Sequence, residues 1–226
     1  MKTVLILLGL LLCCGVTSNT ACASEGLTVQ QGNIFFRANQ LTTLGKDVNP
    51  ALSPDGQTII FVREIKKIDY GDNDPGFILF SQNQGATEIW LMNADGSGQR
   101  SIIKGNQSLS VDSDNFLGWF DSLCFSKDGK KIYFLSQNSL SSANLWMADS
   151  DGRNVRKIMA AHQLDVVGGD LKDEYFGDLV VSSQVSKDAK PLEWKSFLMD
   201  SNNGEIIEAV ADLESFWKKH KKVSDE

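Results

Sequence analysis

Two stretches of the chain share one order of polar turns and apolar runs. The first reads SPDG, TIIFV and EIWLMNADG between Ser53 and Gly96, and the second reads SKDG, KIYFL and NLWMADSDG between Ser126 and Gly152. Ser, Pro, Asp and Gly in this order are typical of a type I turn. The β-branched and aromatic runs favour strands, and the Asp-Gly pairs favour hairpins. A weaker last strand, QRSII or NVRKI, follows in each copy. Each copy therefore predicts a four-stranded antiparallel meander.

The two copies differ by one insertion. Their first turns are 73 residues apart, whereas Trp90 and Trp146, which hold equivalent positions, are 56 apart. The difference of 17 residues falls within Arg63–Thr87 of the first copy. We expect Trp90 and Trp146 to pack between neighbouring sheets.

Weaker copies flank this pair. Downstream, Asp178–Ser182 replaces KIYFL, Ser196–Glu205 replaces the second strand and its turn, and EIIEAV supplies the last strand. Upstream, Gly32–Leu44 is similar to the last two strands of a further unit. Self-similarity at this period indicates a repeat architecture.

The repeat resembles the TolB-type, WD40-like PD40 repeat. The residues that carry the resemblance are Ala51–Gly56 with Ile59–Val62, and Ile89–Gly96. It implies a β-propeller, in which sheets stack radially and the first strand of each lines a central channel. The sequence therefore predicts an all-β fold, a partial or small propeller of about three to four four-stranded antiparallel blades with a short C-terminal helix. Such a fold hosts many activities.

The first residues predict a cleaved export signal. Lys2 is followed by the apolar run Val4–Leu12 and by Ala21-Cys22-Ala23, a small-residue cleavage site. The run is shorter than the roughly 20 residues that span a bilayer. We expect a signal peptide over 1–23 with cleavage after Ala23, blades over 24–211, a helix and charged tail over 212–226, and a periplasmic or secreted protein. An uncleaved anchor and a lipidated cysteine are the alternatives.

Charge and cysteine content narrow the function. The chain has a net charge of −7, and loss of the signal, whose one charged residue is Lys2, makes it −8. An acidic chain is a poor match for nucleic acid or anionic lipid. Cleavage also leaves Cys124 as the single cysteine, which we interpret as a small buried hydrophobe.

No familiar catalytic motif occurs in the mature sequence: it has no G-x-S-x-G elbow, P-loop, H-E-x-x-H or C-x-x-C. We therefore expect no enzyme and no cofactor. Calcium is the metal that the sequence favours most, because Asp69, Asp72 and Asp74 gather oxygen ligands in one loop. A polar turn explains the same loop.

We expect a non-catalytic module that binds a protein partner, with no nucleic acid and no transmembrane segment in the mature chain. Candidate contact residues lie in the insertion and in a second acidic, aromatic loop: Tyr70, Phe77, Phe80, Asp112, Asp114 and Trp119. The run FILFS in the insertion is alternatively a strand, and Trp119 alternatively a core residue. A propeller-channel enzyme, such as a carbohydrate-active lyase or hydrolase, is the rival function.

About three and a half units leave two apolar end faces to cover. Ala211–Lys222 has helical spacing, with Leu213, Phe216 and Trp217 on one face and a basic run, Lys218–Lys222, that we interpret as a solvated end. This helix could cap the last blade or dock elsewhere. The half-unit Gly32–Leu44 could pair with the last copy, or a second molecule could cover the faces in a homodimer.

Overall fold

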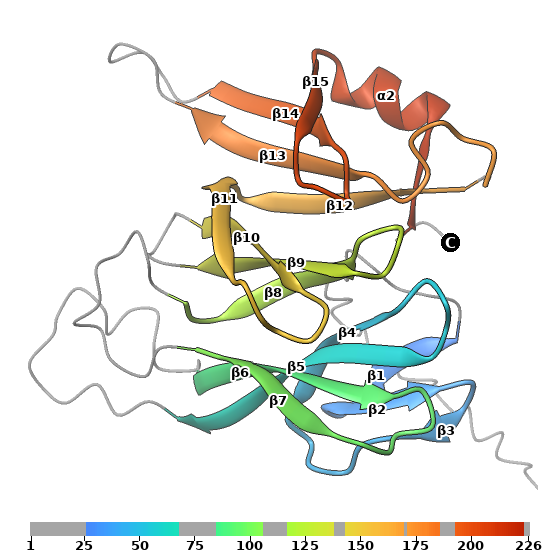
Figure 1. The fold of residues 1–226 in the computed structure, drawn as a ribbon, viewed down its shortest axis with the longest axis vertical. Helices are drawn as coiled ribbons and strands as arrows, with labels where there is room; N and C mark the ends of the chain where they lie inside the picture. Colours follow the sequence, from blue (N-terminus) through green and yellow to red (C-terminus); the bar gives the residue numbers. More distant parts are fainter. Residues whose placement is uncertain are drawn as a thin grey trace, which may run out of the picture.

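Antiparallel sheets follow one another along the long axis of the molecule (Figure 1). The computed structural model describes residues 26–67, 85–105, 117–137, 143–169, 171–185 and 193–223. Within these residues there are four sheets and one α-helix. The predicted all-β fold of three to four antiparallel blades with a short C-terminal helix is confirmed.

The first sheet, here called the N-terminal sheet, contains β1 (Leu27–Gln30), β2 (Asn33–Phe36) and β3 (Asn39–Gln40). The first blade contains β4 (Asp47–Leu52), β5 (Thr58–Lys67), β6 (Gly85–Asn93) and β7 (Arg100–Lys104), paired in that order. The second blade contains β8 (Phe120–Phe125), β9 (Lys131–Gln137), β10 (Ala143–Asp149) and β11 (Arg156–Ala160), also paired in sequence.

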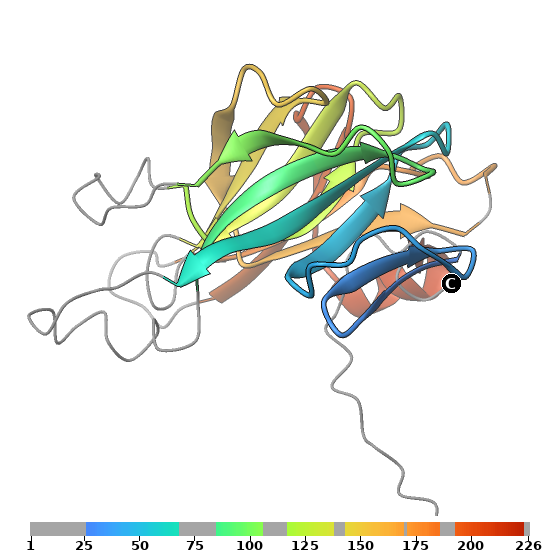
Figure 2. The same cartoon turned by 90° about the horizontal axis from the view of Figure 1, so that it is seen from below.

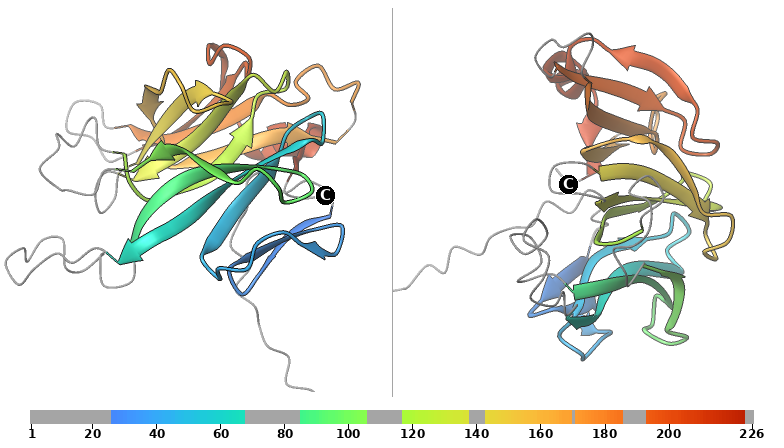
Figure 3. Two further views of the ribbon diagram at one scale, coloured as in Figure 1. Left: turned by 60° about the horizontal axis from the view of Figure 1, so that its bottom comes forward. Right: turned by 90° about the vertical axis from the view of Figure 1, so that its left-hand side faces the viewer.

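The third blade contains β12 (Gln163–Gly168), β13 (Leu179–Val185), β14 (Glu193–Met199) and β15 (Ile206–Val210). A fifth strand, β16 (Lys221–Lys222), pairs with β12 after the helix α2 (Leu213–Lys219). The blades lie face to face, each turned relative to the one before (Figure 3). The degenerate third copy thus forms a complete blade.

The repeated turn has the predicted structure in both copies. In the first, the Ser53 hydroxyl donates to the Asp55 carboxylate (2.5 Å), and the Gly56 amide donates to the Ser53 carbonyl (2.8 Å). In the second, Ser126, Asp128 and Gly129 make the same two bonds at 2.8 and 2.9 Å. The repeated phrase is therefore architectural, because its polar residues close the turn that joins the first two strands of each blade.

The glycine of each outer hairpin also sets the spacing between blades. Gly152 has φ +89°, and a Cβ there would lie 2.3 Å from the Ile102 carbonyl oxygen on the first blade. Gly96 is placed in the same way against Leu41, where a Cβ would lie 3.3 Å from the carbonyl oxygen. Glycine suits both positions because it adopts the left-handed backbone freely, and at Gly152 only glycine also permits the close approach.

An apolar layer separates each sheet from the next. The layer between the first and second blades includes Ile60, Val62, Phe125, Phe134 and Trp146. The layer between the second and third blades joins side chains from both: Cys124, Tyr133, Leu145, Leu164, Leu179, Val181 and Met199. Cys124 is 1% exposed, which confirms that it is a buried small hydrophobe.

The two repeat tryptophans lie on equivalent faces. Trp146 is 5% exposed and belongs to the layer between the first and second blades. Trp90 is half-buried and packs against the layer between the N-terminal sheet and the first blade. Each tryptophan therefore faces the unit that precedes its own blade, as predicted. Phe197, which pairs with Val181, takes this position in the third blade.

The upstream half-unit covers the start of the arc. Leu27, Ile34 and Phe36 pack against Ile59, Phe61 and Met92 of the first blade. Seen from below, the N-terminal sheet lies against the β4 side of that blade (Figure 2). It does not pair with the third blade. That alternative is therefore wrong, because the apolar side of the half-unit is used to cover the first blade.

The C-terminal helix covers the other end of the arc. Leu213, Phe216 and Trp217 of α2 pack over Val167, Val180 and Leu198 of the third blade. Asp212 caps the helix, since its carboxylate accepts from the Ser215 amide at 3.0 Å. The predicted helix cap is confirmed. With both end faces covered, a second molecule is not needed to cover them.

The basic run that follows the helix is not simply a solvated end, as the sequence suggested. Lys221 and Lys222 form β16, and the Lys222 ammonium donates to the Asp165 carboxylate at 3.1 Å. His220 is 5% exposed, and its Nδ1 lies 2.6 Å from Asp173 Oδ2. The chain after α2 turns back because backbone pairing with β12 and these two acidic partners hold it there.

Trp146→Ala tests the packing between blades. Because Trp146 is buried between two sheets, we expect the free energy of unfolding to fall by about 3–5 kcal/mol. Trp194→Ala is the matched control, since Trp194 is 58% exposed, and should change stability by about 0.5 kcal/mol or less. Chemical denaturation followed by circular dichroism measures both. Equal effects of the two substitutions would contradict the layered packing.

Deletion of residues 211–226 tests the C-terminal cap. Without α2 and β16, Val167, Val180 and Leu198 lose their cover, so we expect a lower melting temperature and association in light scattering. Lys218→Ala, which changes an exposed side chain of the helix, should leave both unchanged. A truncated protein that remains monomeric and equally stable would show that the cap is dispensable.

Candidate functional site

Most of the contact and metal residues proposed from sequence lie outside the described part of the chain. These are Asp69, Tyr70, Asp72, Asp74, Phe77, Phe80, Asp112 and Asp114. Their roles remain predictions. Trp119 is described: it is 8% exposed with φ +48°. Its side chain is therefore in the interior, in agreement with the core role that the sequence left as an alternative.

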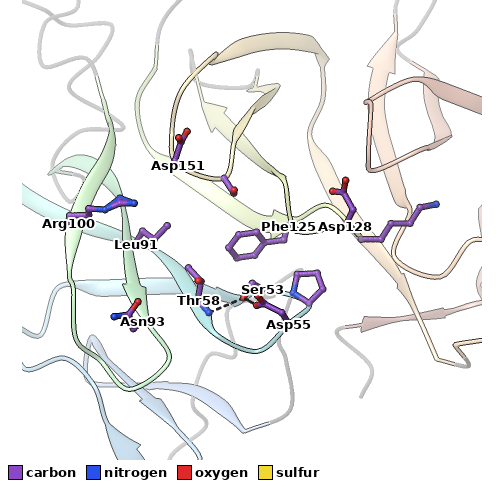
Figure 4. A pocket seen from close by; sticks show the side chains of 13 residues that line it. Ser53, Asp55, Thr58, Leu91, Asn93, Arg100, Phe125, Asp128 and Asp151 are labelled. Atoms are coloured by element: carbon purple, nitrogen blue, oxygen red, sulfur yellow. Dashed lines mark hydrogen bonds between the residues drawn. The ribbon is translucent and has the colours of Figure 1, made fainter.

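A cleft of about 660 Å³ lies between the first and second blades at the end where the repeated turns are. Ser53–Asp55 of the first turn, Lys127–Gly129 of the second, and Ser150 and Asp151 of the β10–β11 hairpin line it. Leu91, Asn93 and Arg100 line it from β6 and β7, and Phe125 from β8 (Figure 4). Pockets of this volume commonly hold small ligands or side chains of a partner.

Three carboxylates of the cleft accept hydrogen bonds within their own turns. Asp55 accepts from the Ser53 hydroxyl (2.5 Å) and the Gln57 amide (3.0 Å), and these bonds lower its pKa. Backbone donation from Lys130 lowers the pKa of Asp128, and donation from the Arg153 side chain lowers that of Asp151. All three are therefore ionised at neutral pH, and they present fixed acceptors rather than a general acid.

The two cations of the cleft differ in their partners. The Lys127 ammonium donates to both oxygens of Asp178 at 3.0 and 3.2 Å, and lies 3.8 Å from Asp200. Its charge is thus neutralised by the third blade. Arg100 is exposed and extends from β7 toward the space that the other side chains surround (Figure 4). Of these two cations, only Arg100 directs its charge into the cleft.

A second polar group lies between the inner strands β4 and β8. The Asn49 amide donates to the Asp121 carboxylate at 2.8 Å, and the Ser122 amide donates to it at 2.7 Å. Asn49 and Ser122 hold equivalent bulge positions with φ +50° and +51°. Asp121 is exposed, yet neighbouring atoms displace part of the water around its carboxyl group, and this desolvation raises its pKa.

The sequence did not identify the cleft. It explained both repeated turns as architecture, which they are, but the same turns also form walls of the cleft. The sequence signal that could have indicated the cleft is position 54, where proline stands in place of the lysine found at the equivalent position 127. Among the described residues, no three His, Cys, Asp or Glu side chains are grouped to hold a metal ion. No helix in this part of the chain is long and apolar enough to cross a membrane.

Comparisons with known proteins agree with the fold and do not identify a function. No family model and no curated protein matches the chain. Among solved structures, it is similar to TolB from Acinetobacter baumannii, with 14% identity, a TM-score of 0.42, and coverage of 76% of this chain and 35% of that one. The β-propeller domain of the Trilobed protease from Pyrococcus furiosus is similar with 18% identity, a TM-score of 0.45, and coverage of 73% of this chain and 42% of that one. An oligogalacturonate lyase in complex with manganese is similar with 12% identity, a TM-score of 0.44, and coverage of 80% of this chain and 60% of that one.

The expected likeness to TolB-type propellers is thus found among solved structures. The chain spans 35% of that TolB and 42% of that propeller domain. At such identities a likeness concerns the fold alone, and the fold class rests on the stacked antiparallel sheets described above.

Proposed function

We propose that the chain is an exported TolB-like β-propeller that binds a protein partner, without catalysis, in the cell envelope or outside the cell. The observation that carries the proposal is the cleft between the first and second blades. Its carboxylates have lowered pKa values and are held by their own turns, which suits recognition by fixed charges. A rigid pair of blades presents these groups in one geometry.

One observation favours the rival, an enzyme that works at the inner strands. Asp121 is a carboxyl group with a raised pKa beside two strained backbone positions, and such groups are frequent in active sites. The neighbouring inner-strand residues Ala51, Leu52, Leu123, Cys124 and Phe125 supply no histidine and no carboxylate. Turnover of an oligosaccharide that is abolished by Asp121→Asn would favour the enzyme.

Photocrosslinking tests the binding function. A photoreactive phenylalanine analogue at Pro54 or Asn93, on the rim of the cleft, should give one discrete adduct in cells of the source organism. The same analogue at Trp194, which is exposed on the third blade, is the control and should not give that adduct. Mass spectrometry identifies the partner. Identical adducts at all three positions, or none at the cleft, would contradict the proposal.

Export is tested separately on the protein produced with its full leader. Mass spectrometry of the mature product should find Ser24 as the first residue, because cleavage after Ala23 follows the small-residue rule. Substitution of Ala23 by a large residue should block this processing. An intact Met1 or a lipidated cysteine in the wild-type product would be the opposite result.

A further inference from the structure

We infer that the cleft between the first and second blades receives a lysine or arginine side chain from a protein partner. This inference rests on the proposed binding function and specifies the chemistry of the partner. It is supported by a comparison of two equivalent junctions in the same chain, by the charges of the cleft and by its apolar floor.

The junction between the second and third blades already holds a lysine. Lys127, in the second repeated turn, places its ammonium group against Asp178, which is 2% exposed. Its backbone amide donates to the Ser201 hydroxyl at 3.0 Å. The equivalent position in the first turn is Pro54, whose side chain carries no charge and is too short to fill the next junction. The cleft is the space that such a lysine would enter.

The acceptors of the cleft are not those that hold Lys127. Lys131, the first residue of β9, holds the position that Asp178, directly before β13, holds in the third blade. The Lys131 ammonium donates to the Asp149 carboxylate at 2.5 Å, which neutralises its charge. An incoming cation therefore meets Asp55, Asp128 and Asp151, with Ser150 at the position equivalent to Ser201. Asp128 forms an ion pair with the exposed Lys130, and Asp151 with the exposed Arg153. The donors to Asp55, in contrast, are the uncharged Ser53 hydroxyl and Gln57 amide of its own turn.

The balance of charge favours a cationic occupant. Three ionised carboxylates line the cleft, and of the two lining cations Lys127 is neutralised by Asp178, so Arg100 is the one opposing charge in the lining. Lys130 and Arg153, which do not line the cleft, offset part of the charge of Asp128 and Asp151 from outside. The whole chain is also acidic, with a net charge of −7, which favours encounter with a basic partner. Arg100 then acts against the ligand, so its removal should strengthen binding.

The floor of the cleft suits the aliphatic part of a lysine or arginine. Leu91, Phe125 and Pro54 line the cleft together with the carboxylates and supply apolar surface. Long basic side chains bury their methylene groups on such surface while the charged end stays among polar groups. The volume of about 660 Å³ leaves room for the adjoining backbone of a peptide.

The test uses the mature protein and blocked pentapeptides with a central lysine, arginine or glutamate between glycines. Titration by ¹H–¹⁵N NMR should shift the amides of Gly56, Gly129 and Asp151 with the lysine and arginine peptides but not with the glutamate peptide. Asp55→Asn and Asp128→Asn, which keep an acceptor for the turn, should each weaken binding about threefold, the size of an exposed ion pair. Asp95→Asn, in a similar turn outside the cleft, is the matched control and should not.

Two further variants give opposite expectations. Arg100→Ala should strengthen binding of the lysine peptide about threefold. Pro54→Lys, which copies the second turn into the first, should abolish it by placing a lysine at the cleft. The melting temperature of each variant confirms folding. Binding should be constant between about pH 5 and 8. Because the pKa values of the three carboxylates are lowered, binding should be lost only below about pH 4, the ordinary value for an aspartate.

Several results would overturn the inference. These are shifts of the same amides by the glutamate peptide, shifts by maltotriose in place of the lysine peptide, or lysine binding that Asp55→Asn and Asp128→Asn together leave unchanged. A partner crosslinked at Pro54 with no lysine binding would also overturn it and leave the binding function intact. Lysine binding without any crosslinked partner would support the cleft chemistry and count against the proposed function.

Discussion

The structure depends on one constraint: each of the three blades is apolar on both faces, and each of these faces must be covered. The chain meets this by alternating sheets with apolar layers, from Leu27 and Phe36 at one end to Phe216 and Trp217 at the other. A closed propeller would cover the end faces with each other. Here a three-stranded sheet and a seven-residue helix cover them instead, in the manner of the terminal caps of open repeat proteins.

Equivalent positions in the first and second blades hold polar residues of different kinds. One row across the first blade contains Asp47, Arg63 and Glu88, and Arg63 donates to both oxygens of Asp47 at 2.6 and 2.9 Å. Arg63 also lies 4.3 Å over the Trp90 ring. In the second blade the same row contains Phe120, Ser136 and Asn144. A buried charge is stable here because it has a bidentate partner and an aromatic face, whereas the second blade fills the row without charge.

The repeated turns serve two purposes because of where they meet. Within a blade, Ser53 and Asp55 close a turn, and the charge of Asp55 has no further role there. Between blades, the turns of two copies and one outer hairpin converge, so carboxylates held for local reasons line a shared cleft. The two junctions differ in the residue of the turn, Pro54 against Lys127, and in the residue that faces it, Lys131 against Asp178. One junction is open, and the next is filled by Lys127.

The sequence by itself determined the blades, since strand runs, turn residues and paired tryptophans are local signals that the period makes unmistakable. It also placed the cap helix, because Leu213, Phe216 and Trp217 recur at helical spacing. Only the tertiary structure decided which faces meet: that the half-unit covers the first blade, that Lys221 and Lys222 pair with β12, that Trp119 is interior, and that a cleft forms beside Pro54. These depend on contacts between residues far apart in the chain, which no local pattern encodes.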